Sequence, residues 1–507
     1  MRRKAWMLGL LLAPLLASAA PADTLSEVRE RGRLLWGADS EGGGPYVYPD
    51  PADPRRMTGF EAELAALLAA DLGVQAKFVQ GPWQNLPALL ETGQIDLVLN
   101  GYELTPARAG RMEHTRPYYI YQLVLLGRRD NPRLTRWQDL DELRLDQPKL
   151  KIGVLEASGA HTYLNQHYAE KVEIVVYEGT TDAMREVETG KLDATLADLP
   201  AAIFYRHRFV ALTQIGEPVG KGHYVMFVRL GDRALRDALD RSLEKLLADG
   251  RLQSLYEKYG LWSELQTELA SLAGRSDKDL GIEATNLRGW AAIRSRGWLL
   301  VDAAGMTILL ACLAMPLAML LGLIVAIGRM YGPAPLRWVM IGYIEILRGT
   351  PLMLQLFVIF FLLPEIGFPI PAFYAAVAGL AINYSAYEAE IYRAGLQAVP
   401  RGQMEAAVAL GMPLGMALRR IIIPQAARIV VPPITNDFIA MFKDTSVCSV
   451  ITVMELTKQY SVQRNDTGAT LELAALTALL YLLMSIPLSR LATVLERRFA
   501  RQPRTAS

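Results

Sequence analysis

Two similar stretches of sequence each lead into residues that could contact a small ligand. Residues 91–99 (ETGQIDLVL) recur as residues 188–196 (ETGKLDATL), and each copy predicts a helix end, a glycine C-cap and a strand. We interpret the aspartate of each copy as a turn residue. Ligands of open α/β sheets bind at the carboxyl ends of strands. Residues 100–103 and 197–198, which follow the two copies, are therefore predicted to face a shared cleft.

Several charged residues of this predicted cleft could bind a ligand that carries charges of its own. Arg108 could bind both oxygens of a carboxylate through its guanidinium group. Asp198 could accept a positively charged group, and Asp39 lies at the end of the first predicted strand. Glu103 and Glu156 could also be proposed as the acid/base pair of an extracytoplasmic enzyme, although nothing in the sequence defines their separation.

The sequence offers no residues for metal, phosphate or nucleic-acid chemistry. Its two cysteines, Cys312 and Cys448, belong to no Cys/His cluster with metal-ligand spacing, so no metal site is predicted. No G-x-x-x-x-G-K-[ST] loop occurs, so we expect no bound ATP and no cofactor in this chain. The net charge is +1 and no basic run occurs, which gives no indication of nucleic-acid binding.

Residues 405–424 (EAAVALGMPLGMALRRIIIP) form an Arg-flanked polar interruption between apolar stretches. Glu405, Ala406 and Ala407 predict a short helix with small residues on one side, and Gly411 predicts its end. A rigid, protruding element of this kind could be bound by another protein. An ordinary surface helix is the alternative interpretation.

The chain of 507 residues is long enough for several domains, and its two halves differ in composition. A basic start, an apolar run and small residues predict a signal peptide over residues 1–22, with an uncleaved anchor as the alternative. Residues 23–265 alternate between helical and strand patterns, which predicts an α/β domain of two lobes with mainly parallel sheets. Polar residues 266–297 are interpreted as a linker.

Residues 298–494 predict an all-α transmembrane domain of about five helices, followed by a tail over residues 495–507. The predicted spans cover residues 303–328, 338–363, 372 onward, 428–450 and 473–489. Pro432 and Pro433 are expected to break the fourth span. Its polar residues Asn436, Asp437 and Lys443 are candidates for a translocation path, because broken helices often line such paths.

Arginine residues predict the orientation of these spans. They gather around residues 393–428 and in the tail, whereas the turn at residues 364–371 has no lysine or arginine. By the positive-inside rule the segment 400–424 and the C-terminus lie in the cytoplasm, and residues 23–265 lie outside.

Four motifs of the membrane half identify a family. They are EILRGTPLMLQ (345–355), AYEAEIYRAG (386–395), RGQMEAA (401–407) and KDTS (443–446). Together they resemble the permeases of the polar amino-acid family of ABC importers. The segment 405–424 resembles their EAA loop, with Ile423 where leucine is usual. The resemblance implies a location in the bacterial inner membrane and a cytoplasmic ATPase partner, which binds ATP and Mg²⁺ and acts through residues 400–424.

The motifs GFE (59–61), TPAR (105–108) and RPYY (116–119) extend the resemblance to the exported half, over most of residues 30–262. They are similar to the family's extracytoplasmic binding proteins, in which two lobes close on an amino acid. The resemblance implies that Arg108 binds the ligand carboxylate and that Asp198 accepts its ammonium group.

Further residues of the two predicted lobes could also contact the ligand. Ser158 and Gly159 begin a predicted helix, and their N–H groups could meet the carboxylate at its positive end. Trp83 could line the side-chain pocket, although a core tryptophan is nearly as good an interpretation. Glu103 stands where the family usually has serine or threonine.

The predicted acidic rim favours a basic or otherwise unusual amino acid as the substrate. The rim consists of Asp39, Glu41, Glu103 and Glu156.

Five membrane spans do not easily enclose a path for the substrate, so a homodimer or a pair with a homologous permease is expected. An amino-acid-gated channel or a sensor with a bilobed ligand domain is the alternative function. A channel would carry a filter such as T-V-G-Y-G, and a sensor would need a signalling domain beyond the last span.

Overall fold

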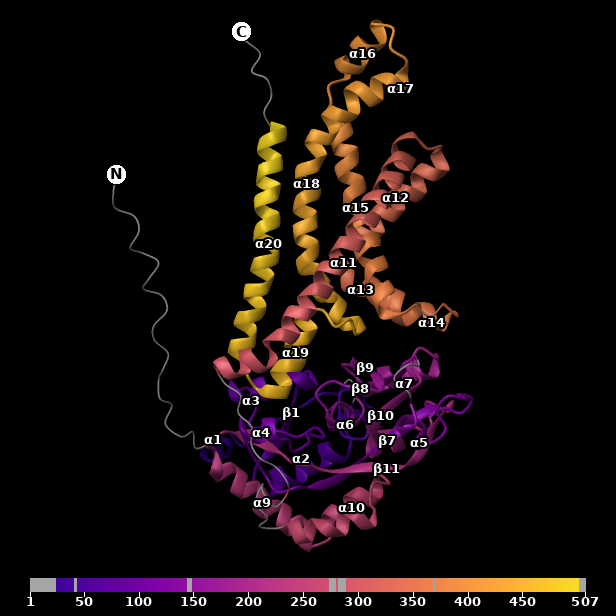
Figure 1. The fold of residues 1–507 in the computed structure, drawn as a ribbon. Coiled ribbons are helices and arrows are strands. Elements are labelled where there is room, and N and C mark those ends of the chain that lie inside the picture. The colour runs from indigo at the N-terminus through magenta and orange to yellow at the C-terminus, as the bar shows by residue number, and fades with distance from the viewer. Residues whose placement is uncertain are drawn as a thin grey trace, which may run out of the picture. The chain divides into compact units, whose positions relative to one another are not determined.

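The chain folds into two compact units, Met1–Gln122 with Lys221–Ala284 and Leu123–Gly220 with Thr285–Ser507. The computed structural model describes residues 24–40, 43–143, 148–272, 280, 289–368 and 370–500. The predicted signal peptide, residues 1–22, lies outside them. We call residues 24–122 with 221–272 lobe 1, residues 123–220 lobe 2, and residues 289–500 the helical domain (Figure 1).

Lobe 1 is built on a sheet with the strand order β4-β1-β5-β12-β6. β1 pairs in parallel with β4 and β5, whereas β12 is antiparallel to β5 and β6. The strands are β1 (Arg33–Ala38), β4 (Gln75–Gln80), β5 (Leu97–Val98), β6 (Met112–His114) and β12 (Phe227–Arg229), with the separate pair β2 (Tyr48–Pro49) and β3 (Met57–Thr58). The helices are α1 (Thr24–Arg31), α2 (Phe60–Asp71), η1 (Trp83–Asn85), α3 (Leu86–Glu91), α4 (Pro106–Ala109), α9 (Arg233–Ala248), α10 (Arg251–Lys258) and η2 (Glu264–Leu272).

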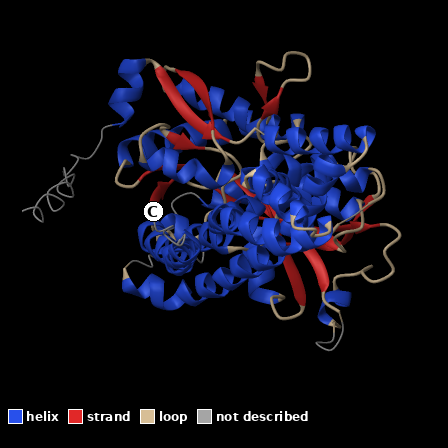
Figure 2. Ribbon diagram, turned by 90° about the horizontal axis from the view of Figure 1, so that it is seen from above, coloured by secondary structure: helices blue, strands red, loops and turns tan. Residues whose placement is uncertain are grey.

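Lobe 2 repeats this topology, because its strand order β9-β8-β10-β7-β11 matches that of lobe 1 position by position. β8 pairs in parallel with β9 and β10, and β7 is antiparallel to β10. The strands, red in Figure 2, are β7 (Tyr119–Arg128), β8 (Leu150–Leu155), β9 (Val172–Tyr177), β10 (Ala194–Asp198) and β11 (Leu212–Tyr224). The helices are α5 (Gln138–Asp141), α6 (Gly159–His167), α7 (Thr180–Glu188) and α8 (Leu199–Tyr205). The prediction of an α/β fold with two similar lobes is confirmed.

The two sequence repeats also adopt the same local structure. The carboxylate of Asp96 accepts a hydrogen bond from the backbone N–H of Leu35 at 2.7 Å, and the Asp96 N–H donates to the Leu35 carbonyl at 2.8 Å. Asp193 makes the same pair of bonds to Lys151, at 2.8 and 2.9 Å. Each aspartate therefore joins the start of its strand to the neighbouring parallel strand, which confirms its structural role.

The helical domain follows a long connection and begins at Trp290, ahead of residue 298, where its start was predicted. Its elements are α11 (Trp290–Tyr331), α12 (Ala334–Gly349), α13 (Leu352–Phe357), η3 (Val358–Leu362), α14 (Leu363–Glu365), α15 (Ala372–Ala398), α16 (Arg401–Ala409), α17 (Leu414–Ala417), η4 (Leu418–Ile422), α18 (Ile423–Asp444), η5 (Thr445–Ile451), α19 (Leu456–Thr467) and α20 (Thr470–Ala500). Among the described residues, α11 and the stretch Thr470–Arg490 are long and apolar enough to cross a membrane, and a bent helix pair can be counted as a third span.

That bent pair lies where one span over residues 338–363 was predicted, and it shows that this segment is bent rather than a single straight helix. α12 and the stretch Leu352–Leu362, which comprises α13 and η3, are bent by 109° relative to each other. The residue before a proline is disfavoured in helical conformation, and Thr350, which precedes Pro351, is extended (φ −118°, ψ 144°). Gln355 holds the bend, because its Nε2 donates to the Leu347 carbonyl at 2.9 Å and its Oε1 accepts from Asn383 Nδ2 at 3.1 Å.

α18 corrects a second expectation, because it is not broken at Pro432 and Pro433 but continues through both. Each proline lacks an N–H group and removes one intrahelical hydrogen bond, yet the helix persists on either side. In the same region Thr435 Oγ1 donates to the Val431 carbonyl at 2.8 Å. The argument that α18 lines a path because it is broken therefore fails.

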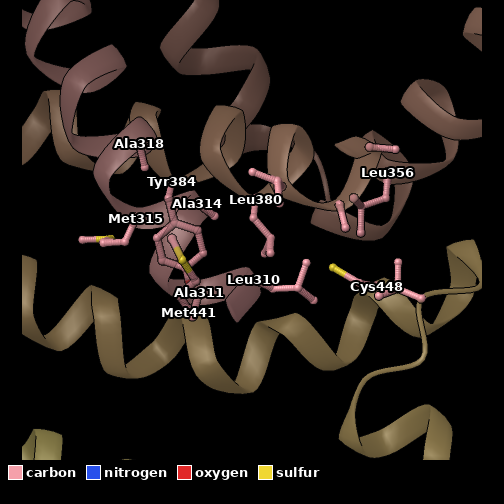
Figure 3. Close-up of a cluster of buried hydrophobic side chains, with 14 of the residues drawn as sticks. Leu310, Ala311, Ala314, Met315, Ala318, Leu356, Leu380, Tyr384, Met441 and Cys448 are labelled. Carbon is pink, nitrogen blue, oxygen red and sulfur yellow. The ribbon is translucent and has the colours of Figure 1, made fainter. Parts of the chain in front are cut away.

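Small residues allow the helices of this domain to approach closely. Ala311, Ala314 and Ala318 of α11 pack in one buried cluster with Leu380 and Tyr384 of α15 (Figure 3). Such close packing gives the bundle a rigid centre.

Candidate functional site

Arg108 of lobe 1 lies in a nearly closed environment of acidic and aromatic groups. Its Nη1 donates to Glu103 Oε2 at 2.6 Å and to the Glu103 carbonyl at 2.9 Å. The guanidinium carbon lies 4.4 Å from the ring centroid of Tyr102 and 4.9 Å from that of Trp83. Only 8% of Arg108 is exposed. A buried cation needs such partners, and they hold the guanidinium in a defined orientation from which it could bind an anion.

Asp39 and Trp83 are joined at the carboxyl end of β1. The Asp39 carboxylate accepts hydrogen bonds from the Trp83 N–H at 2.8 Å and from Gln80 Nε2 at 3.0 Å. Trp83 Nε1 donates to the Asn100 carbonyl at 3.1 Å, and Asn100 Oδ1 accepts from the Asp39 N–H at 2.8 Å. The structure thus brings Asp39, Trp83, Glu103 and Arg108 together within lobe 1.

In lobe 2, Ser158 is the N-cap of α6, which begins at Gly159 as predicted. Ser158 Oγ accepts from the His161 N–H at 3.2 Å, and the Ser158 N–H donates to the Leu155 carbonyl at 3.3 Å. That N–H is therefore engaged inside its own loop, and contact with a ligand would require it to exchange partners. Asp198 ends β10 and is the N-cap of α8, but its side chain makes no capping hydrogen bond.

The predicted acidic rim needs correction, because two of its members are neutralised by cations. Glu103 pairs with Arg108, as described, and Glu156 Oε2 lies 2.6 Å from Lys458 Nζ. Glu41 lies outside the described residues. Sequence analysis missed Lys458, because no motif includes it and its partner lies in another domain.

The predicted protruding element forms a helical hairpin between α15 and α18 (Figure 1). α16 ends at Ala409 and is followed by Gly411 at φ +79°, whose N–H donates to the Val408 carbonyl at 2.9 Å. Met412 donates to the Ala407 carbonyl at 3.1 Å, which completes a glycine-dependent helix end. Glu405 and Ala406 are exposed, whereas Ala407 is buried.

Four apolar side chains are exposed on and after α16. They are Val408, Leu410, Leu414 and Met416, with exposed fractions from 42% to 82%. Exposed apolar residues concentrated on one small element are typical of a protein-binding surface.

Three polar residues of α18 were predicted to line a translocation path. Asn436 and Lys443 are exposed, lie seven residues apart and so share one face of the helix, and Asp437 is half-buried. Next to Lys443, Asp444 accepts a hydrogen bond from Tyr384 Oη at 2.6 Å.

Comparison with known families assigns each half of the chain. The family of bacterial extracellular solute-binding proteins, family 3, matches residues 39–261. The family of binding-protein-dependent transport system inner membrane components matches residues 318–501.

Individual relatives cover the membrane half. The L-cystine transport system permease protein TcyB of Bacillus subtilis (strain 168) is 38% identical over 214 residues, which are 42% of this chain and 92% of that protein. The glutamine transport system permease protein GlnP of Escherichia coli (strain K12) is 36% identical over 211 residues, 41% of this chain and 96% of that protein. A crystal structure of an amino acid ABC transporter with histidines is 41% identical, covers 41% of this chain and 98% of its own, and has a TM-score of 0.40.

Proposed function

We infer the function of this chain from its family: it belongs to the inner-membrane components of binding-protein-dependent transport systems, and a family 3 solute-binding domain precedes its permease domain. The chain is the solute-binding and membrane-spanning part of an ABC importer of polar amino acids. It is not an enzyme, and ATP is hydrolysed by a separate subunit. The observation that carries this conclusion is that both families match one chain in sequential order, which does not favour a gated channel or a sensor.

In lobe 1 the ligand carboxylate binds to Arg108. The support for this assignment is the orientation that Glu103, Tyr102 and Trp83 impose on the guanidinium. In lobe 2 the ligand ammonium binds to Asp198, at the carboxyl end of β10. Ser158 and Gly159 offer the start of α6 as a second anion site.

In the helical domain the ATPase grips the hairpin of α16 and α17 through Glu405, Ala406, Ala407 and Gly411. The exposed apolar residues of this hairpin support the assignment. The hairpin faces the cytoplasm and the lobes face the outside, as the arginine distribution favours. Two permease domains, either identical or homologous, pair to enclose the path, and Asn436, Asp437 and Lys443 contribute to it.

Calorimetric titration of the purified full-length chain with a panel of amino acids tests the binding role. We expect at least one polar amino acid to bind, and Arg108→Ala to weaken it about 100-fold or more, because a charge-assisted contact is lost. Arg111→Ala is the matched control, because Arg111 is three residues away and pairs with Glu91 at 2.6 Å. Unchanged affinity in Arg108→Ala would refute the carboxylate assignment, and a complete lack of binding would refute the amino-acid substrate.

A further inference from the structure

Lys458 of the helical domain contacts lobe 2 through an ion pair that is buried on both sides. Lys458 Nζ lies 2.6 Å from Glu156 Oε2 and 3.5 Å from Glu178 Oε1. The exposed fractions of the two principal side chains are only 2% and 1%. All three residues belong to the same compact unit.

The two acids lie at the edge of the lobe 2 sheet where ligands bind. Glu156 directly follows β8, and Glu178 directly follows β9, so both stand at carboxyl ends of adjacent parallel strands. Asp198 ends β10 at the same edge, and Ser158 begins α6 beside it. A lysine from the membrane half therefore enters the ligand-binding edge of lobe 2.

Lys458 is held firmly in this position. The carboxylate of Glu455 accepts from the Lys458 N–H at 2.7 Å and thereby caps α19. Leu456 is buried in a cluster with Leu300 and Ala304 of α11. α19 lies at the end of the bundle opposite to α16 and α17 (Figure 1), which is the end that faces the lobes' side of the membrane in the proposed orientation.

The carboxylate of Glu156 can accept a further hydrogen bond at its second oxygen. Its Oε1 is buried and has no hydrogen-bond partner among the described residues, although Oε2 is paired with Lys458. A buried carboxylate oxygen without a partner is costly, and a ligand ammonium or guanidinium group would satisfy it.

A second contact between lobe 2 and the helical domain lies away from the ligand-binding edge and serves as a comparison for Lys458. Lys191 Nζ donates to the Phe360 carbonyl at 2.6 Å and lies 3.9 Å from the Phe360 ring centroid. Lys191 precedes β10 and so lies at the amino end of the sheet, away from the ligand-binding edge. Attachment alone does not require a lysine at the opposite edge.

We propose that Lys458 competes with a cationic side chain of the substrate for Glu156. This inference rests on the proposed function and deepens it, because Asp198 takes the α-ammonium group and Glu156 takes a second positive charge. When Lys458 holds Glu156, the site favours release of a basic amino acid. When the substrate holds Glu156, Lys458 is displaced and the contact between lobe 2 and α19 weakens.

Titration of the full-length chain with arginine and with glutamine tests the competition. In Lys458→Met we expect arginine to bind about tenfold more tightly, or to gain measurable binding, because a competing charge is gone. Glutamine, which has no side-chain charge, should bind as in the original chain. Lys191→Met combined with Glu186→Gln is the matched control, because it removes the attachment at the other edge, leaves no buried charge unpaired and should change neither affinity.

The remaining outcomes separate the hypothesis that Lys458 competes with the substrate from the hypothesis that the chain binds amino acids. Equal shifts for arginine and glutamine, or no shift for either, would overturn the competition while the amino-acid receptor stands. A lack of any amino-acid binding in the original chain would overturn both. If Lys458→Met does not fold, the double variant with Glu156→Gln leaves no buried charge unpaired, and arginine should then bind no more tightly than glutamine does.

Discussion

The carboxyl edges of the two sheets differ in where their acidic side chains find partners. In lobe 1, Glu103 pairs with Arg108, and Asp39 accepts from the Trp83 N–H, so each acid is satisfied inside its own lobe. In lobe 2, Glu156 pairs with Lys458 from the helical domain. The two lobes share one topology, so the difference does not come from the fold.

This difference assigns separate roles to two similar halves. The lobe 1 edge is organised without help from the permease and is suited to hold a ligand in a constant geometry. The lobe 2 edge has an acid paired with a permease residue, and in the proposed competition this pair would report occupancy to the membrane. Two lobes of the same topology can therefore differ in role when the cation that pairs with a buried glutamate comes from the same lobe in one case and from another domain in the other.

The largest expected effect concerns one buried acid in each lobe, Glu61 and Glu186. Glu61 of lobe 1 is completely buried, and its Oε1 accepts from Tyr118 Oη at 2.5 Å and from the Gly101 N–H at 2.8 Å. Burial raises its pKa from 4.5 to about 8. The buried acid of lobe 2, Glu186, instead pairs with Lys191 at 2.9 Å, although burial raises the pKa of Glu186 as well.

Glu61 predicts a pH-dependent stability of lobe 1. The folded state keeps its proton up to about pH 8, whereas the unfolded chain loses it near 4.5, so stability is full below pH 4.5 and falls as the pH rises toward 8. The slope approaches about 1.4 kcal/mol per pH unit. Hydrogen exchange of lobe 1 amides should show this slope, and Glu61→Gln should flatten it. The surface variant Glu63→Gln should keep it, and a slope that survives in Glu61→Gln would contradict the assignment.

The next effect compares the repeat aspartates. The side chain of Asp96 is 3% exposed and pairs with Arg31, whereas that of Asp193 is 16% exposed and lies 3.3 Å from Arg133. Replacement by alanine leaves a strand N–H without its acceptor in both lobes. We expect losses of about 2–3 kcal/mol for Asp96→Ala and about 1 kcal/mol for Asp193→Ala, because an unmade bond costs more where water is excluded.

Hydrogen exchange measured separately in each lobe checks the order of these two losses. Burial raises the pKa of Asp96, and the Leu35 N–H and Arg31 both act in the opposite direction. Equal losses in the two lobes would show that exposure does not control the strength of this turn.

The sequence predicted those features of the molecule that depend on neighbouring residues. The turns at Asp96 and Asp193, the start of α6 at Gly159 and the helix end at Gly411 all follow from local hydrogen bonding and backbone preference.

Features that depend on distant partners could not be predicted. The pairing of Glu156 with Lys458 depends on how lobe 2 packs against α19, and no local pattern encodes it. The continuity of α18 through Pro432 and Pro433 was missed because packing in the bundle overrides the local cost of proline. The break at Thr350 instead had a local signal in Pro351, which the prediction of one span over residues 338–363 did not use.

The smallest expected effect tests whether the repeats are equivalent in their backbones. Gly93 and Gly190 have φ values of +74° and +77°, a region that costs an L-residue about 1–2 kcal/mol. A Cβ at Gly93 would lie 3.4 Å from Arg229 Nη1, and one at Gly190 would lie 3.0 Å from Arg128 Nη1. Both neighbours are ends of flexible side chains that can move away. Gly93→Ala and Gly190→Ala should therefore destabilise their own lobes equally in hydrogen exchange, and a clearly larger loss at Gly190 would mean that the arginine contact, rather than the backbone, distinguishes lobe 2 from lobe 1.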